Sequence, residues 1–159
     1  MITDHHARGG ATVAVLSKME AWEANMVLNL RLWCEGPAGQ EQVWTEYRRA
    51  LPGAEAKREC HAFECLLRTL VATAHRPLVR HDVACACVGA DEGVFVNLIR
   101  IASEGHLTDA ALIATLLSGP AQAEQIAILA GQVGECAKRI HRSDANYIPS
   151  SPQKVVRLH

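Results

Sequence analysis

Apolar residues recur every three to four positions along most of this chain, a spacing typical of amphipathic helices. In the first such segment, about residues 12–35, the repeat consists of Val15, Met19, Trp22, Met26, Leu30 and Trp33. Thr12 is suited to cap the start of this helix, and Gly36-Pro37 is a stop signal after it. The pattern therefore predicts one long first helix with a single apolar face.

Five further segments show the same period and are separated by glycine and proline signals. We expect these helices at about residues 39–51, 54–74, 91–105, 108–117 and 120–142. Gly105 suits a left-handed cap, Thr108 is placed to cap the fifth helix, and Pro120 suits a first helical turn. The sequence thus predicts an all-α fold, a single compact bundle of about six helices.

The chain has 159 residues, which suits one domain. We expect a flexible N-terminus at 1–11, a helical domain at 12–142 and a mobile C-terminal tail at 143–159. The tail is assigned on its two prolines and scattered polar residues.

Residues 75–90 break the helical period between the third and fourth predicted helices. Val83, Cys85 and Cys87 alternate with other small residues, as in a short strand. Because no partner strand is evident from the sequence, we interpret the segment as an irregular, buried Cys/His-rich linker.

This linker contains two imidazoles and two thiols, from His75, His81, Cys85 and Cys87. Zinc is commonly bound by four such donors in a tetrahedron, and an extended Cys-x-Cys points both sulfurs to one side. The spacing differs from the usual Cys-x₂₋₄-Cys pairs of structural zinc sites. The alternative is that both cysteines pack as small apolar residues.

His61 and Cys65 lie one turn apart on the third predicted helix, away from its main apolar stripe. They are expected either to face the linker, as alternate zinc ligands, or to face a neighbouring helix or solvent.

Asp91 and Glu92 follow Gly89 at a predicted helix start, where carboxylates would repel a phosphate. They are expected to cap the helix, with an oxygen ligand or an acceptor for His81 as the alternative.

From residue 101 to residue 137 the chain contains no lysine or arginine, and the fifth predicted helix is apolar almost all round. Such a helix lies either in the centre of a core or at a subunit interface. Helices 107–137 are therefore the expected contact for a homodimer or a protein partner.

Composition excludes several classes of protein. Apolar residues make up 49% and charged residues 21%, which excludes a mainly disordered chain. The net charge of −1 and the lack of basic residues early in the last helix argue against nucleic-acid binding. The longest apolar run, 110–117, is too short to span a membrane.

The compartment is inferred from the first ten residues, which lack an apolar core, so a cytoplasmic protein with reduced cysteines is expected. Twelve arginines against four lysines are typical of a GC-rich bacterial genome. These features lead to a first hypothesis of a non-enzymatic bacterial protein that binds or senses zinc. The second hypothesis is a metal-free oligomerisation or adaptor domain, and the third is a Cys-His thiol enzyme.

Overall fold

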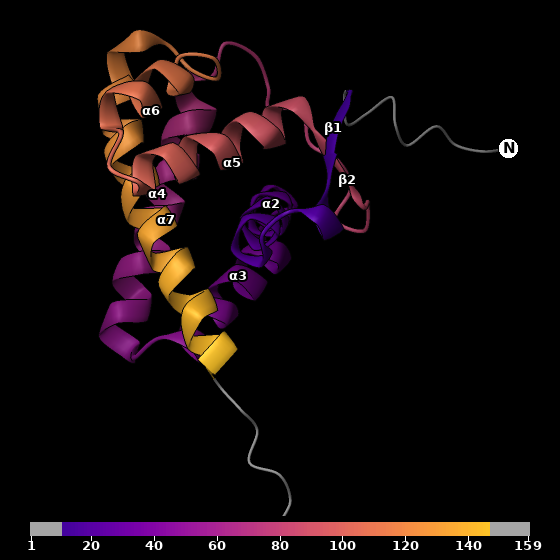
Figure 1. Cartoon of the computed structure of the whole chain (residues 1–159), viewed down its shortest axis with the longest axis vertical. Helices are drawn as coiled ribbons and strands as arrows, with labels where there is room; N and C mark the ends of the chain where they lie inside the picture. The colour runs from indigo at the N-terminus through magenta and orange to yellow at the C-terminus, as the bar shows by residue number, and fades with distance from the viewer. Residues whose placement is uncertain (1–10, 147–159) are drawn as a thin grey trace, which may run out of the picture.

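The computed structural model describes residues 11–146 and confirms the all-α prediction, with six α-helices and one small two-stranded sheet (Figure 1). The elements are β1 (Thr12–Val15), the 3₁₀ turn η1 (Leu16–Lys18), α2 (Ala21–Cys34), α3 (Pro37–Ala50), α4 (Gly53–Thr73), β2 (Cys87–Gly89), α5 (Ala90–Ser103), α6 (Leu107–Ala114), the 3₁₀ turn η2 (Pro120–Gln122) and α7 (Ala123–Asn146). The predicted flexible segment 1–11 and most of the predicted tail lie outside the described residues.

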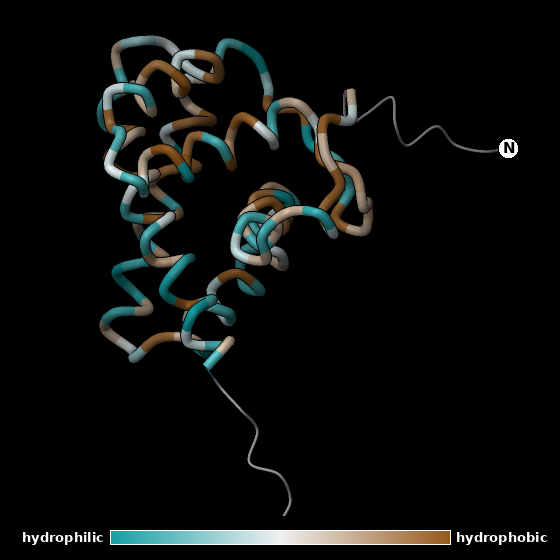
Figure 2. Tube along the Cα trace, viewed as in Figure 1, coloured by the Kyte–Doolittle hydropathy of each residue, from teal (hydrophilic) through white to brown (hydrophobic). Residues whose placement is uncertain are grey.

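The two long helices α4 and α7 run side by side in opposite directions, and α5 crosses them near one end (Figure 1). Helix α6 packs on α5 and α7 at that end, while α2 and α3 fill the space between α5 and the other end. Figure 2 shows apolar segments along α5 and around α6. The core is continuous through all six helices, so burial of their apolar faces holds the bundle together.

The prediction of a first helix from Thr12 is wrong, because residues 12–15 form strand β1 and the helix α2 begins at Ala21. Thr12, Val13 and Val15 are β-branched, which favours an extended backbone over a helix. Val15 and Met19 nevertheless continue the three- to four-residue spacing of the apolar residues of α2. The spacing therefore predicted a helix that begins too early.

The reading of the linker as wholly irregular is also corrected, because its end is strand β2, paired antiparallel with β1. The partners are Thr12 with Gly89, Ala14 with Val88, and Val15 with Cys87. The partner strand was not evident from the sequence because it lies more than 70 residues earlier, at the start of the described chain. The sheet therefore ties the first described residues to the start of α5.

Turn signals located most helix ends. Gly36, with φ +109°, precedes Pro37 at the first position of α3, and Gly105, with φ +90°, follows α5 as predicted. Thr108 does not cap α6, which begins one residue earlier after His106. Helix α7 extends to Asn146, past the expected end at 142.

Two glycines allow helices to approach closely. A Cβ atom on Gly39 of α3 would lie 1.9 Å from the carbonyl oxygen of Leu32 on α2. A Cβ atom on Gly134 of α7 would lie 2.8 Å from Cγ2 of Ile99 on α5. Both positions exclude any larger residue without movement of a neighbouring helix.

Among residues 11–146, no helix combines the length and the apolar content needed to cross a membrane.

Candidate functional site

The linker is organised around Arg31 of α2, whose side chain is fully buried beside that of Glu92 on α5. The guanidinium donates to both carboxylate oxygens of Glu92, at 2.7 and 2.9 Å. This bidentate geometry is the strongest form of an arginine–carboxylate contact. The ion pair joins α2 to the start of α5.

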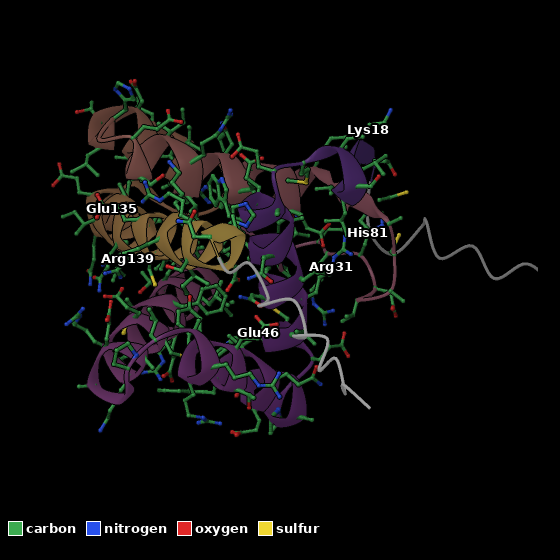
Figure 3. All side chains as sticks on the ribbon, turned by 60° about the horizontal axis from the view of Figure 1, so that its bottom comes forward. Lys18, Arg31, Glu46, His81, Glu135 and Arg139 are labelled. Carbon is green, nitrogen blue, oxygen red and sulfur yellow. The ribbon has the colours of Figure 1, made fainter. Side chains whose placement is uncertain are left out.

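The same guanidinium also fixes the linker backbone. Arg31 donates to the carbonyl oxygens of Asp82 at 3.1 Å, Cys85 at 2.7 Å and Cys87 at 2.6 Å. Figure 3 shows Arg31 next to His81, at the side of the molecule where the linker lies. Because Arg31 donates hydrogen bonds to three linker carbonyls as well as to a carboxylate, the linker backbone is held in one conformation against α2.

Glu92 completes this centre by accepting the backbone N–H groups of His81 at 3.0 Å and Gly89 at 2.9 Å. Burial by itself raises the pKa of Glu92, but hydrogen bonds from Arg31 and from those two backbone groups outweigh it. The pKa of Glu92 therefore lies below its ordinary value. The carboxylate stays ionised in the core because every partner favours its charged form.

Asp91 holds the first half of the linker in a similar way. It accepts two bonds from Arg76, at 2.7 and 2.9 Å, and the backbone N–H of Val79 at 2.7 Å. The hydrogen bond from Arg76 lowers the pKa of Asp91 below its ordinary value. The predicted capping role is thus seen for Glu92, which accepts the N–H of the N-cap Gly89, whereas Asp91 holds the segment that precedes the helix.

His81 and Cys85 are the one predicted ligand pair of the linker that lies in contact, with Sγ 3.5 Å from Nδ1. A turn closes between them, since Cys85 donates its backbone N–H to the carbonyl oxygen of Asp82 at 2.9 Å. His81 is 2% exposed, and its Nε2 has no hydrogen-bond partner among the described residues. The pair therefore places a thiol beside an imidazole whose second nitrogen is unused in residues 11–146.

The other two predicted ligands of the linker, His75 and Cys87, lie elsewhere. Nε2 of His75 donates to the carbonyl oxygen of Thr115 at 3.0 Å, and Thr115 directly follows α6. Cys87 is held in β2, while Cys85 lies in the preceding turn, so the Cys-x-Cys is not one continuous extended unit. The predicted zinc ligands of the linker are close in the sequence but separated in space, because each is held by a different element.

His61 and Cys65 contact each other on α4, with Nε2 3.5 Å from Sγ. His61 is exposed and lies 3.7 Å from Glu64, so this pair faces solvent rather than the linker. Within residues 11–146 there is no cluster of three or more His, Cys, Asp or Glu side chains that could hold a metal ion. The structure therefore brings four of the six predicted ligands into two separate pairs, leaves His75 and Cys87 apart, and forms no tetrahedral set in residues 11–146.

The remaining thiols pack in the bundle. Burial raises the pKa of Cys60 to about 12 and that of Cys136 to about 11. Burial also raises the pKa of the half-buried Cys34. Such thiols stay protonated near neutral pH and act as small apolar side chains, as the sequence indicated for Cys34 and Cys136.

Helix α6 forms a second candidate site, made of apolar surface. Ala110 and Ala114 are buried, whereas Leu112 is 64% exposed and Leu116, just after the helix, is 66% exposed. We call Leu112 and Leu116, which lie one helical turn apart, the α6 face. The helix is therefore not wrapped on all sides by its own chain, although its sequence is apolar almost all round.

Sequence reasoning missed Arg31, whose partners are distant along the chain. The available signal was an arginine between Leu30 and Leu32 in an otherwise apolar helical face, together with two adjacent acids at a helix start. A buried arginine needs a buried acid, so those two observations fit one another.

Comparison with protein families, with curated proteins and with solved structures gives no match to this chain.

Proposed function

We propose that this chain is a non-enzymatic association domain that pairs with a second copy of itself through the α6 face. The observation behind the proposal is the exposure of Leu112 on α6 and of Leu116 in the turn that follows it, while Ala110 and Ala114 of the helix are buried. Burying one leucine side chain contributes about 1.5–3 kcal/mol. A two-fold contact would bury four of them, which gives a substantial driving force.

The charges around this face favour a second copy over a charged partner. No lysine or arginine occurs between residues 101 and 137, and α6 itself has a single charged residue, Asp109 in its first turn. A two-fold interface brings the same patch of both chains together, so the patch must be complementary to itself. His75 and Arg76 of the linker line a hollow beside Leu116, but Arg76 is paired with Asp91. The two leucines themselves form an apolar patch that meets this condition.

The position of α6 supports the same proposal. It lies at one end of the bundle, where α4 ends and α7 begins, packed on α5 and α7 (Figure 1). Ala110 and Ala114 hold it against the core. The two leucines are therefore presented on a rigid support, and association requires little ordering of the chain.

Sedimentation equilibrium of the full chain tests this proposal. We expect the wild-type protein to form a dimer, and L112S/L116S to raise the dimer Kd by at least about 100-fold. The matched control is V13S, which makes the same kind of apolar-to-polar change at Val13, a residue that is 57% exposed on β1, away from α6. The proposal is wrong if the wild type stays monomeric to about 1 mM, or if the double variant dimerises as tightly as V13S.

Zinc binding by His81 and Cys85 is our second proposal, and the distance between their donor atoms supports it. On a tetrahedral zinc ion, a sulfur at about 2.3 Å and a nitrogen at about 2.1 Å lie about 3.6 Å apart. The observed separation is 3.5 Å. Water or a second chain would have to complete the coordination, and for this reason the zinc proposal ranks below association.

Native mass spectrometry of the reduced chain tests the zinc proposal. One bound zinc adds about 65 Da per chain relative to the denatured mass. C85S is expected to lose this excess, while the control C65S, which removes the half-buried thiol of α4, retains it. A bare chain mass after incubation with zinc would exclude the proposal and leave association unaffected.

A further inference from the structure

A pocket of about 420 Å³ lies between the first half of α2, the end of α3 and the end of α7. It is at the opposite end of α7 from α6, so it is separate from the proposed association face (Figure 1). Its volume is within the range of small-molecule sites. None of the three hypotheses from the sequence assigned a site to these residues.

The inner wall of the pocket is apolar. Trp22, Met26 and Tyr47 line it and are 5%, 2% and 3% exposed. Buried Ala137 and half-buried Ile140 contribute the wall on α7. These side chains suit the hydrocarbon or aromatic part of a ligand.

One polar group of the wall is unused. Asn29 is 1% exposed, and its Oδ1 has no hydrogen-bond partner in the described part of the chain. A buried acceptor without a donor costs about 1–3 kcal/mol. A ligand that supplies an N–H or O–H group at this position would remove that cost.

Charges of both signs surround the pocket. Glu46 and Asp144 are exposed at its rim, opposed by the guanidinium of Arg49, and the ammonium of Lys138 lies 5.2 Å from the ring centroid of Trp22. Figure 3 shows Glu46 between α2 and α3, close to the end of α7. Partial burial raises the pKa of Glu46, although the amides of Asn29 and Asn25 act in the opposite direction. A cation next to this carboxylate would favour its ionised form.

We propose that this pocket binds a small organic amine. The protonated amino group would donate to Oδ1 of Asn29 and pair with the carboxylate of Glu46. The apolar body of the amine would lie against Trp22 and Met26. The combination of an unused acceptor, a nearby carboxylate and an apolar wall distinguishes this ligand class from carboxylates and phosphates, which would meet Glu46 as a like charge.

The experiment is an NMR titration of the full chain with 2-phenylethylamine, followed through the indole signals of Trp22. Phenylacetate has the same ring and the opposite charge, and serves as the matched probe. We expect saturable binding of the amine and at least about tenfold weaker binding of phenylacetate. Equal binding of the two probes, or no binding of the amine at about 10 mM, would overturn the proposal.

Two variants locate the amino group. E46Q is expected to weaken amine binding about fivefold, and N29L about tenfold, because each removes one partner of the ammonium. The control E41Q changes an exposed glutamate on the same helix and should leave the affinity unchanged. Unchanged affinity in E46Q would contradict the proposal even if N29L fails to fold.

Discussion

Arg31 connects α2 to two other parts of the molecule through one side chain: to α5 by its pair with Glu92, and to the linker by three backbone carbonyls. Removal of one partner of a buried ion pair leaves the other charge without compensation in the core. The loss here also includes the three carbonyls that face the guanidinium.

We therefore predict that R31M lowers the free energy of unfolding by about 3–5 kcal/mol in urea denaturation. The control is R48M, since Arg48 pairs with Glu41 at an exposed position and should contribute less than about 1 kcal/mol. Equal effects of the two substitutions would show that the linker is not anchored by Arg31.

The pair of Asp91 with Arg76 predicts a pH effect. Arg76 lowers the pKa of Asp91, so the stabilisation is present above the ordinary carboxyl pKa of 3.8 and is lost as pH falls through the folded-state value. Because Arg76 is largely exposed, we expect D91N to cost about 1 kcal/mol at pH 6. This difference from wild type should shrink below pH 4 in urea titrations. A pH-independent difference would contradict the assignment.

At this scale the sequence predicted part of the arrangement. It indicated that Asp91 and Glu92 act at a helix start, and Glu92 does accept the backbone N–H of Gly89. It could not indicate their arginine partners, which lie 15 and 61 positions earlier along the chain. Local spacing describes turns and caps, whereas these pairs depend on how α2 and α5 meet.

Among the elements, the helices were predictable and the sheet was not. Periodicity and turn residues located six helices, because each carries its own apolar face. The three-residue strand β2 is stable only when paired with β1, and that pairing joins positions more than 70 residues apart. An isolated pair of such short strands has little stability of its own, so its signal in the sequence is weak.

The close helix contacts give a prediction for three glycines. G39A and G134A should each destabilise the protein by about 1–3 kcal/mol, because the added methyl group would overlap a neighbouring helix. G53A should instead be neutral or stabilising by up to about 1 kcal/mol, since a Cβ there meets nothing within 4 Å. Thermal unfolding of the three variants measures this. A destabilised G53A together with a neutral G134A would contradict the close contact of α7 with α5.

For the whole molecule, the α6 face and the proposed amine pocket lie at opposite ends of the bundle. The α6 face lies where α7 begins, and the amine pocket lies where α7 ends (Figure 1). The predicted zinc set did not assemble because its members are bound to different elements: His75 to the end of α6, and Cys87 to β1. Closeness along the chain was a poor guide to closeness in space.

The central claim, association through the α6 face, is tested most directly by methyl NMR of the full chain over a range of concentrations. We predict that the signals of Leu112 and Leu116 shift with concentration, while those of Val13, equally exposed on β1, remain constant. Shifts confined to other methyl groups would place the interface elsewhere. Spectra that do not change up to about 1 mM would contradict association.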